Sequence, residues 1–176
     1  IVDKEGQARP LVAKEEKIVV TGKTPADFVS RGITPMQSAS LLLILVAGIS
    51  IYGIRRGKTL WGMDLILFLV AGMAGCILAF LALFSQHPAV SPNYILFVFH
   101  PFHLFCLPFM LSRVRKREIS RYMLVNFAVL TLFIGLWAII PQRIPPAILP
   151  LALCLLIRSA SNLILTYKRK IGRAHV

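Results

Sequence analysis

Apolar residues along the chain gather into five runs, each about as long as a membrane-crossing helix. The runs cover approximately residues 36–54, 63–84, 94–112, 122–140 and 147–167. A hydrocarbon core about 30 Å thick requires roughly 20 helical residues, which is close to the length of each run. The pattern predicts an all-α membrane protein with a five-helix transmembrane domain over residues 35–170.

Residues 1–34 follow a different pattern, with mixed charge and frequent glycine and proline. Two short stretches, 11–12 and 17–21, have β-like composition, and residues 3–6 (Asp-Lys-Glu-Gly) indicate a turn before them. A segment this short cannot build its own core. We therefore expect an irregular or β-like tail, formed by the end of a periplasmic domain and a linker. The first residues are neither basic nor followed by a short apolar run, so no signal peptide is predicted.

Basic residues lie in three clusters, after the first, third and fifth apolar runs. The clusters are residues 55–58, 113–121 and 168–170, whereas Arg143 is the one base in the loops on the opposite face. The positive-inside rule places the clusters in the cytoplasm and predicts an N-out, C-in topology. The net charge of +13 therefore reflects membrane orientation, and we expect no nucleic-acid partner.

Composition agrees with a multi-pass membrane protein. Hydrophobic residues make up 57% of the chain, and charged residues only 15%, against about 25% in soluble domains. Cys76, Cys106 and Cys154 each lie inside an apolar run without close spacing, which disfavours disulfides and zinc. We expect neither a cofactor nor a metal.

Three histidines lie in or after the loop between the second and third runs. His100 and His103 have the i, i+3 spacing of one helix face, and with His87 they would supply three imidazole ligands. Pro101 and Pro108 would distort such a site. The alternatives are hydrogen bonds to backbone carbonyls that the prolines leave free, or a surface for lipid substrates.

The loop itself offers no ordered nucleophile, base and acid, so a serine hydrolase is not predicted. Ser91 or Asn93 is a candidate N-cap for the third run. The predicted lipid or partner surface consists of His87, Ser91, Asn93, His100 and His103. No catalytic residue is predicted within the chain.

Two opposite charges lie within or beside apolar runs. Asp64 is at the start of the second run, and Arg158 lies in the fifth, one turn before Asn162. Charges inside a membrane are costly and are usually paired, so these three residues are a candidate intramembrane polar group. The alternative is that Arg158 extends to the interface and Asp64 is solvated at its helix terminus.

Residues 171–176 are predicted to fit neither a helix nor a helix cap. They resemble the translated read-through of a sequencing adapter, and we expect them to be an artefactual tail in which His175 has no role.

Several motifs resemble a known family. They are Asp3-Lys-Glu-Gly with Arg9-Pro-Leu-Val, Trp61-x-x-Asp64, a Gly-rich stretch ending at Gly75, Phe84-Ser-x-His-Pro-Ala-Val-Ser-Pro-Asn93 and His100-Pro-x-His103. Together they resemble the C-terminal membrane part of Lnb-type proteins, which have an N-terminal periplasmic domain and are linked to bacterial lipoprotein N-acylation. The resemblance extends over nearly all of the chain up to Lys170.

The resemblance implies a multi-pass protein of the bacterial inner membrane that belongs to an acyltransferase, with the catalytic domain N-terminal to residue 1. This chain would then be the membrane anchor and lipid-access part and would be inactive alone. Its expected partners are the phospholipid bilayer, lipoproteins and a phospholipid acyl donor. Two alternatives remain, a purely structural anchor or interaction module and a small transporter module. The lack of internal repeats disfavours the transporter.

Overall fold

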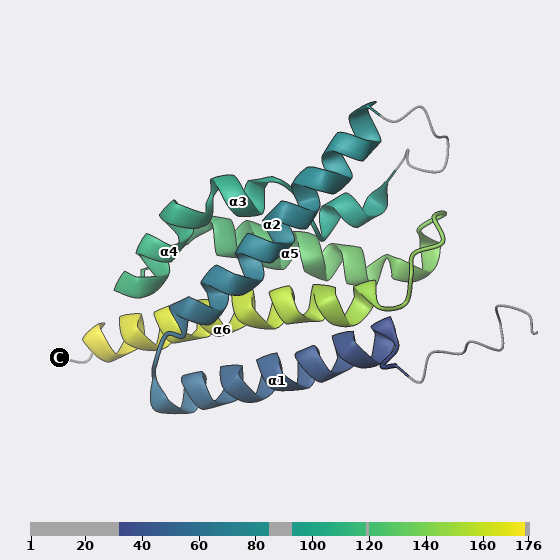
Figure 1. Cartoon of the computed structure of the whole chain (residues 1–176). Helices are drawn as coiled ribbons and strands as arrows, with labels where there is room; N and C mark the ends of the chain where they lie inside the picture. Colours follow the sequence, from purple (N-terminus) through teal and green to yellow (C-terminus); the bar gives the residue numbers. More distant parts are fainter. Residues whose placement is uncertain (1–31, 85–92, 119, 175–176) are drawn as a thin grey trace, which may run out of the picture. The chain divides into compact units, whose positions relative to one another are not determined.

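The computed structural model describes residues 32–84, 93–118 and 120–174, and those residues contain helices and no strands (Figure 1). Residues 33–176 form one compact unit. Its elements are α1 (Pro35–Arg56), α2 (Trp61–Phe84), the 3₁₀ helix η3 (Tyr94–Phe97), α3 (Phe102–Phe105), α4 (Leu107–Lys116), α5 (Arg121–Gly135), the 3₁₀ helix η4 (Trp137–Ile139) and α6 (Ile148–Ala174). The predicted β-like tail lies outside the described residues, apart from its last three positions.

Three helices have the length and hydropathy needed to cross a membrane. They are α1, α2 and α6, and the bent pair formed by Tyr94–Phe105 and Leu107–Lys116 raises the number to four if it counts as one span. Helix α5 is apolar but has only 15 residues. The prediction of an all-helical membrane protein is confirmed for the described part of the chain.

Local sequence signals fix both ends of α1. The Thr34 hydroxyl accepts a hydrogen bond from the Gln37 amide, and the Gln37 side chain accepts one from the Thr34 amide. This reciprocal capping box, with Pro35 in the first turn, starts the helix. Gly57 ends it in the left-handed conformation at φ 61°, which glycine adopts without steric cost.

The third predicted span is not a continuous helix. Residues 94–116, here called the broken element, form η3, α3 and α4, and the axis turns by 78° at the break between Phe105 and Leu107. Each proline begins a new helix, with Pro101 capping α3 and Pro108 in the first turn of α4. Proline lacks the amide hydrogen that a helix interior needs but is tolerated in a first turn. The expected single helix over 94–112 is therefore wrong.

The fourth and fifth predicted spans also end elsewhere. Helix α5 stops at Gly135, and the chain then continues as η4 to an extended Ile140, because the residue before Pro141 avoids helical angles. Helix α6 continues past residue 167 to Ala174. The expectation that residues 171–176 fit no helix is therefore wrong for residues 171–174.

Helix packing divides the elements into two sets. Helix α6 packs against α1 on one side and α5 on another, whereas α2 packs mainly against α3 and α4 (Figure 1). The consecutive helices α1 and α2 make few direct contacts. A buried apolar cluster joins α2, the broken element, α5 and α6; its members include Phe68, Val98, Met110, Met123, Leu130 and Leu155.

Two glycines allow the broken element to approach α2 at backbone distance. A Cβ atom on Gly72 would lie 2.6 Å from the Leu104 amide nitrogen, and one on Gly75 would lie 2.5 Å from the His100 carbonyl carbon. Backbone atoms cannot move aside as a side-chain terminus can. The small residues of α2 thus allow the backbone of the broken element to pack directly against this helix.

Gly75→Ala should therefore lower the free energy of unfolding by about 1–3 kcal/mol, the usual cost of overpacking. The measurement is the unfolding midpoint in mixed micelles titrated with SDS. Gly48→Ala is the matched control, since a Cβ there meets no described atom within 4 Å. Equal midpoints for the two variants would contradict the proposed close packing of Gly75 against the broken element.

Candidate functional site

A buried ion pair links α2 to α6. The guanidinium of Arg158 donates from Nε to Oδ1 of Asp64 at 2.7 Å and from Nη2 to Oδ2 at 3.0 Å. Arg158 is 1% exposed and Asp64 is fully buried. This two-point geometry matches the planar guanidinium to the planar carboxylate, and it keeps both charges paired away from lipid.

Two further side chains complete this group, which we call the charge network. Arg158 also donates from Nη1 to the Ser50 hydroxyl at 3.0 Å, and the Asn162 amide donates to Asp64 Oδ2 at 3.0 Å. The network thereby joins α1, α2 and α6. The structure brings the three sequence-selected residues Asp64, Arg158 and Asn162 together, and adds Ser50.

The charge network is a structural contact that holds α1, α2 and α6 together. All four side chains are buried, and the acceptors and donors are largely satisfied by one another. A second buried bond, from the Asn126 amide to the Ser159 hydroxyl at 2.9 Å, ties α5 to α6. Such closed polar contacts stabilise helix association in apolar surroundings.

His103 is the buried centre of a second polar group. Its Nε2 lies 2.8 Å from the Val98 carbonyl oxygen, and its Nδ1 lies 2.6 Å from the Tyr122 hydroxyl. A carbonyl only accepts, so Nε2 carries the hydrogen, and in the neutral ring Nδ1 accepts from the tyrosine. His103 thus satisfies a carbonyl in the broken element and also links that element to α5.

His100 stacks on His103, with ring centroids 3.9 Å apart and an interplanar angle of 18°. Its Nδ1 is buried without a hydrogen-bond partner among the described residues. The edge of Phe68 also packs on His103, with the centroids 5.3 Å apart. Both nitrogens of His103 are thus already engaged, which favours the hydrogen-bonding alternative over the metal alternative for this histidine.

The rest of the predicted surface is only partly described. Asn93 caps η3, its side-chain oxygen accepting from the Ile95 amide at 3.1 Å, and the neighbouring Tyr94 amide donates to the Gln142 side chain at 2.7 Å. These bonds fix η3 against the α5–α6 connection. His87 and Ser91 lie outside the described residues, so the structure does not relate them to His100 and His103.

Sequence reasoning missed Ser50 and Tyr122. Ser50 is one of several small polar residues in α1, and Tyr122 was considered only as the start of the fourth apolar run. The available signal was general: a polar side chain in an apolar helix needs a partner. It did not single out these two residues.

Comparison with known proteins agrees with the helical membrane fold. The family model described as the Lnb transmembrane domain matches residues 27–170, which is well over half of the chain. Neither a curated protein nor a solved structure matches the chain. The match to the Lnb model covers the charge network, the three histidines His87, His100 and His103, and the helices up to Lys170. The chain therefore belongs to the Lnb transmembrane domain family.

Proposed function

We propose that this chain is the membrane anchor and lipid-access part of a lipoprotein N-acyltransferase of the bacterial inner membrane. In this proposal it works with the periplasmic catalytic domain that the resemblance places N-terminal to it. Membership of the Lnb transmembrane domain family is the observation that carries the proposal. The charge network and the His103 contacts are structural supports in this scheme, and the catalytic residues belong to the other domain.

A five-crossing, N-out topology is part of the proposal. The directions of α1, α2, the broken element, α5 and α6 alternate between the two ends of the bundle (Figure 1). Helix α5 with η4 would rise about 28 Å, close to a hydrocarbon thickness. The C-terminal turns of α1 and α4 are both basic, which supports a cytoplasmic location for that end.

The proposed lipid-access surface includes the outer part of the broken element. Phe102 and Phe105 of α3 and Phe109 of α4 are 65%, 66% and 78% exposed, on the two sides of the break. In a bilayer these exposed phenylalanines contact acyl chains, and the break turns the axis of the element by 78° between them. Substrate acyl chains would reach the catalytic domain beside Asn93 and the loop that precedes it.

His87→Ala and Asn93→Ala in the chain joined to its catalytic domain should reduce lipoprotein N-acylation while leaving membrane insertion and folding normal. Mass spectrometry of the modified lipoprotein N-terminus measures the product. Ser38→Ala is the control, because this exposed serine only bonds within the first turn of α1. Full acylation by both site variants would favour the structural-anchor alternative instead.

A further inference from the structure

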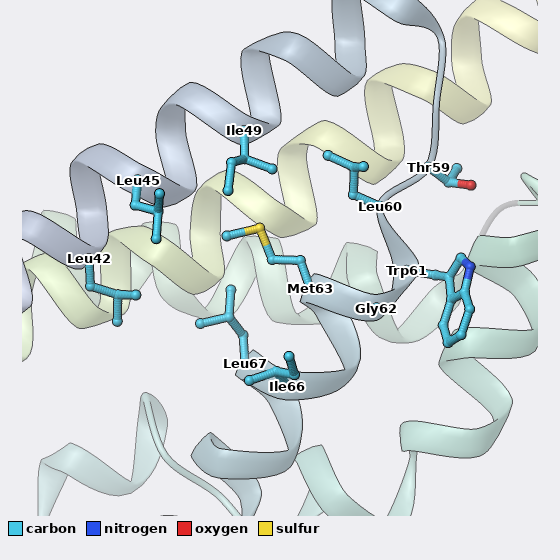
Figure 2. A pocket seen from close by; sticks show the side chains of 10 residues that line it. All are labelled: Leu42, Leu45, Ile49, Thr59, Leu60, Trp61, Gly62, Met63, Ile66 and Leu67. Atoms are coloured by element: carbon cyan, nitrogen blue, oxygen red, sulfur yellow. The ribbon is translucent and has the colours of Figure 1, made fainter.

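An apolar groove runs between α1 and α2 where these helices do not meet. It has a volume of about 600 Å³, within the roughly 300–1,000 Å³ range of small-molecule sites. Leu42, Leu45 and Ile49 line one wall at i, i+3, i+7 spacing, and Met63, Ile66 and Leu67 line the other. Figure 2 shows the α1 side chains directed toward those of α2.

The groove opens to the side of the bundle. Leu45 is 56% exposed and Ile66 is 64% exposed, although both line it. Ser50 and Asp64 follow the lining residues Ile49 and Met63 directly in the sequence, and both bind Arg158. The charge network therefore keeps the two walls at a fixed separation, and an acyl chain in the bilayer can enter the groove laterally.

Trp61 connects the groove to a second cavity with a different lining. This cavity of about 570 Å³ is bounded by Trp61, Pro108, Leu111, Ser112, Arg115 and Lys116. The Arg115 guanidinium carbon lies 5.0 Å from the Trp61 ring centroid, a cation–π contact that holds the positive charge beside the groove. An apolar groove thus ends at an aromatic ring and two exposed bases.

Neither base of this cavity has a carboxylate partner within the described part of the chain. The two acids in that part are Asp64, held by Arg158, and Glu118, which pairs with Arg113 at 2.6 Å. Arg169 of α6 donates to the Lys116 carbonyl oxygen and so adds a further base near the same helix end. Among the described residues, the cavity is therefore a site of positive charge without a carboxylate partner, at the basic end of the bundle.

We propose that this pair of cavities binds one anionic phospholipid, with an acyl chain in the α1–α2 groove and the phosphate between Arg115 and Lys116. The apolar length of the groove, the Trp61 ring at its end and two bases with no carboxylate partner among the described residues together match the parts of such a lipid. The site lies at the opposite end of the bundle from Asn93. It is distinct from the proposed lipid-access surface and does not depend on the acyltransferase proposal.

The two tryptophans of the chain allow a direct test, because Trp61 begins α2 and lines both cavities, whereas Trp137 begins η4 and lines neither of them. In phosphatidylcholine nanodiscs, the Trp137→Phe variant reports on Trp61 alone. Replacing an equal fraction of lipid with dibrominated phosphatidylglycerol should quench Trp61 more than dibrominated phosphatidylcholine does. The Trp61→Phe variant, which reports on Trp137, should show no preference between the two lipids.

Arg115→Gln with Lys116→Gln should lower the phosphatidylglycerol preference at Trp61 on the order of tenfold, since each base near an anionic lipid contributes several-fold. Arg55→Gln with Arg56→Gln is the matched control, as it removes two charges from a neighbouring basic cluster that does not line the second cavity. An equal loss in both double variants would show general surface attraction and overturn the site. Equal quenching of Trp61 by the two brominated lipids in the Trp137→Phe variant, with Arg115 and Lys116 unchanged, would also overturn the proposed site.

A second measurement serves if a tryptophan variant fails to fold. Native mass spectrometry of the unsubstituted chain, released from nanodiscs containing equal phosphatidylglycerol and phosphatidylcholine, should retain one phosphatidylglycerol. The Arg115→Gln, Lys116→Gln variant should lose it, and the Arg55→Gln, Arg56→Gln variant should keep it. Retention of phosphatidylcholine alone would contradict the proposal.

Discussion

Asp64→Ala should lower the free energy of unfolding by roughly 3–5 kcal/mol, the largest effect expected from a single substitution in this chain. The change leaves the Arg158 guanidinium buried with only the Ser50 hydroxyl as a described side-chain acceptor. An uncompensated buried cation is more costly than the pair it came from. The unfolding midpoint in SDS-titrated mixed micelles measures the difference.

Glu118→Ala is a matched control for this loss of a carboxylate. Its ion pair with Arg113 joins side chains that are 46% and 60% exposed, so solvent screening limits the expected cost to about 1 kcal/mol or less. The double substitution Asp64→Leu, Arg158→Met should recover most of the stability, because both charges leave together. A double variant as unstable as Asp64→Ala would contradict the charge-network account.

His103→Leu should be the second most damaging change, at about 2–5 kcal/mol of unfolding free energy. Leucine fills similar space but deprives the buried Val98 carbonyl and the half-buried Tyr122 hydroxyl of their present partner. An orphaned buried group costs about 1–3 kcal/mol, and the partly solvated hydroxyl costs less than that upper limit. Native-state hydrogen exchange should rise in the broken element and at the start of α5. The same SDS titration gives the magnitude.

Tyr122→Phe provides the comparison for this second prediction. It removes one of the two hydrogen bonds and keeps the other, so a smaller loss than for His103→Leu is expected. Combined with His103→Leu it removes the orphaned hydroxyl, and the two losses should sum to more than the double variant shows. Strict additivity would indicate that the two side chains act independently.

The sequence was most informative where a single physical requirement dominated. The length of apolar runs predicted α1, α2 and α6, because a membrane-spanning helix needs a long unbroken apolar stretch. Scarcity of charge likewise limited the possible pairings. Asp64 and Arg158 are the charged residues inside the apolar runs, and their proximity in the structure follows from the cost of leaving either one unpaired there.

The broken element shows where sequence reasoning stopped. Pro101 and Pro108 indicated distortion, but proline chemistry does not say whether a helix bends or restarts. The answer depends on packing against Gly72 and Gly75, which lie 32 residues before Leu104 and 25 residues before His100, the residues whose backbone they approach. No local pattern encodes that match. The cation–π contact between Trp61 and Arg115 is long-range in the same way.

The separation in sequence between Asp64 and Arg158 has a consequence for biosynthesis. The two residues are 94 positions apart, so at roughly 5–20 residues per second the ribosome needs about 5–20 s to deliver the arginine after the aspartate. During that interval the nascent α1–α2 hairpin carries an unmatched carboxylate beside lipid. A chain whose translation stops before α6 lacks Arg158 altogether, so its Asp64 carboxylate keeps no described cation to pair with.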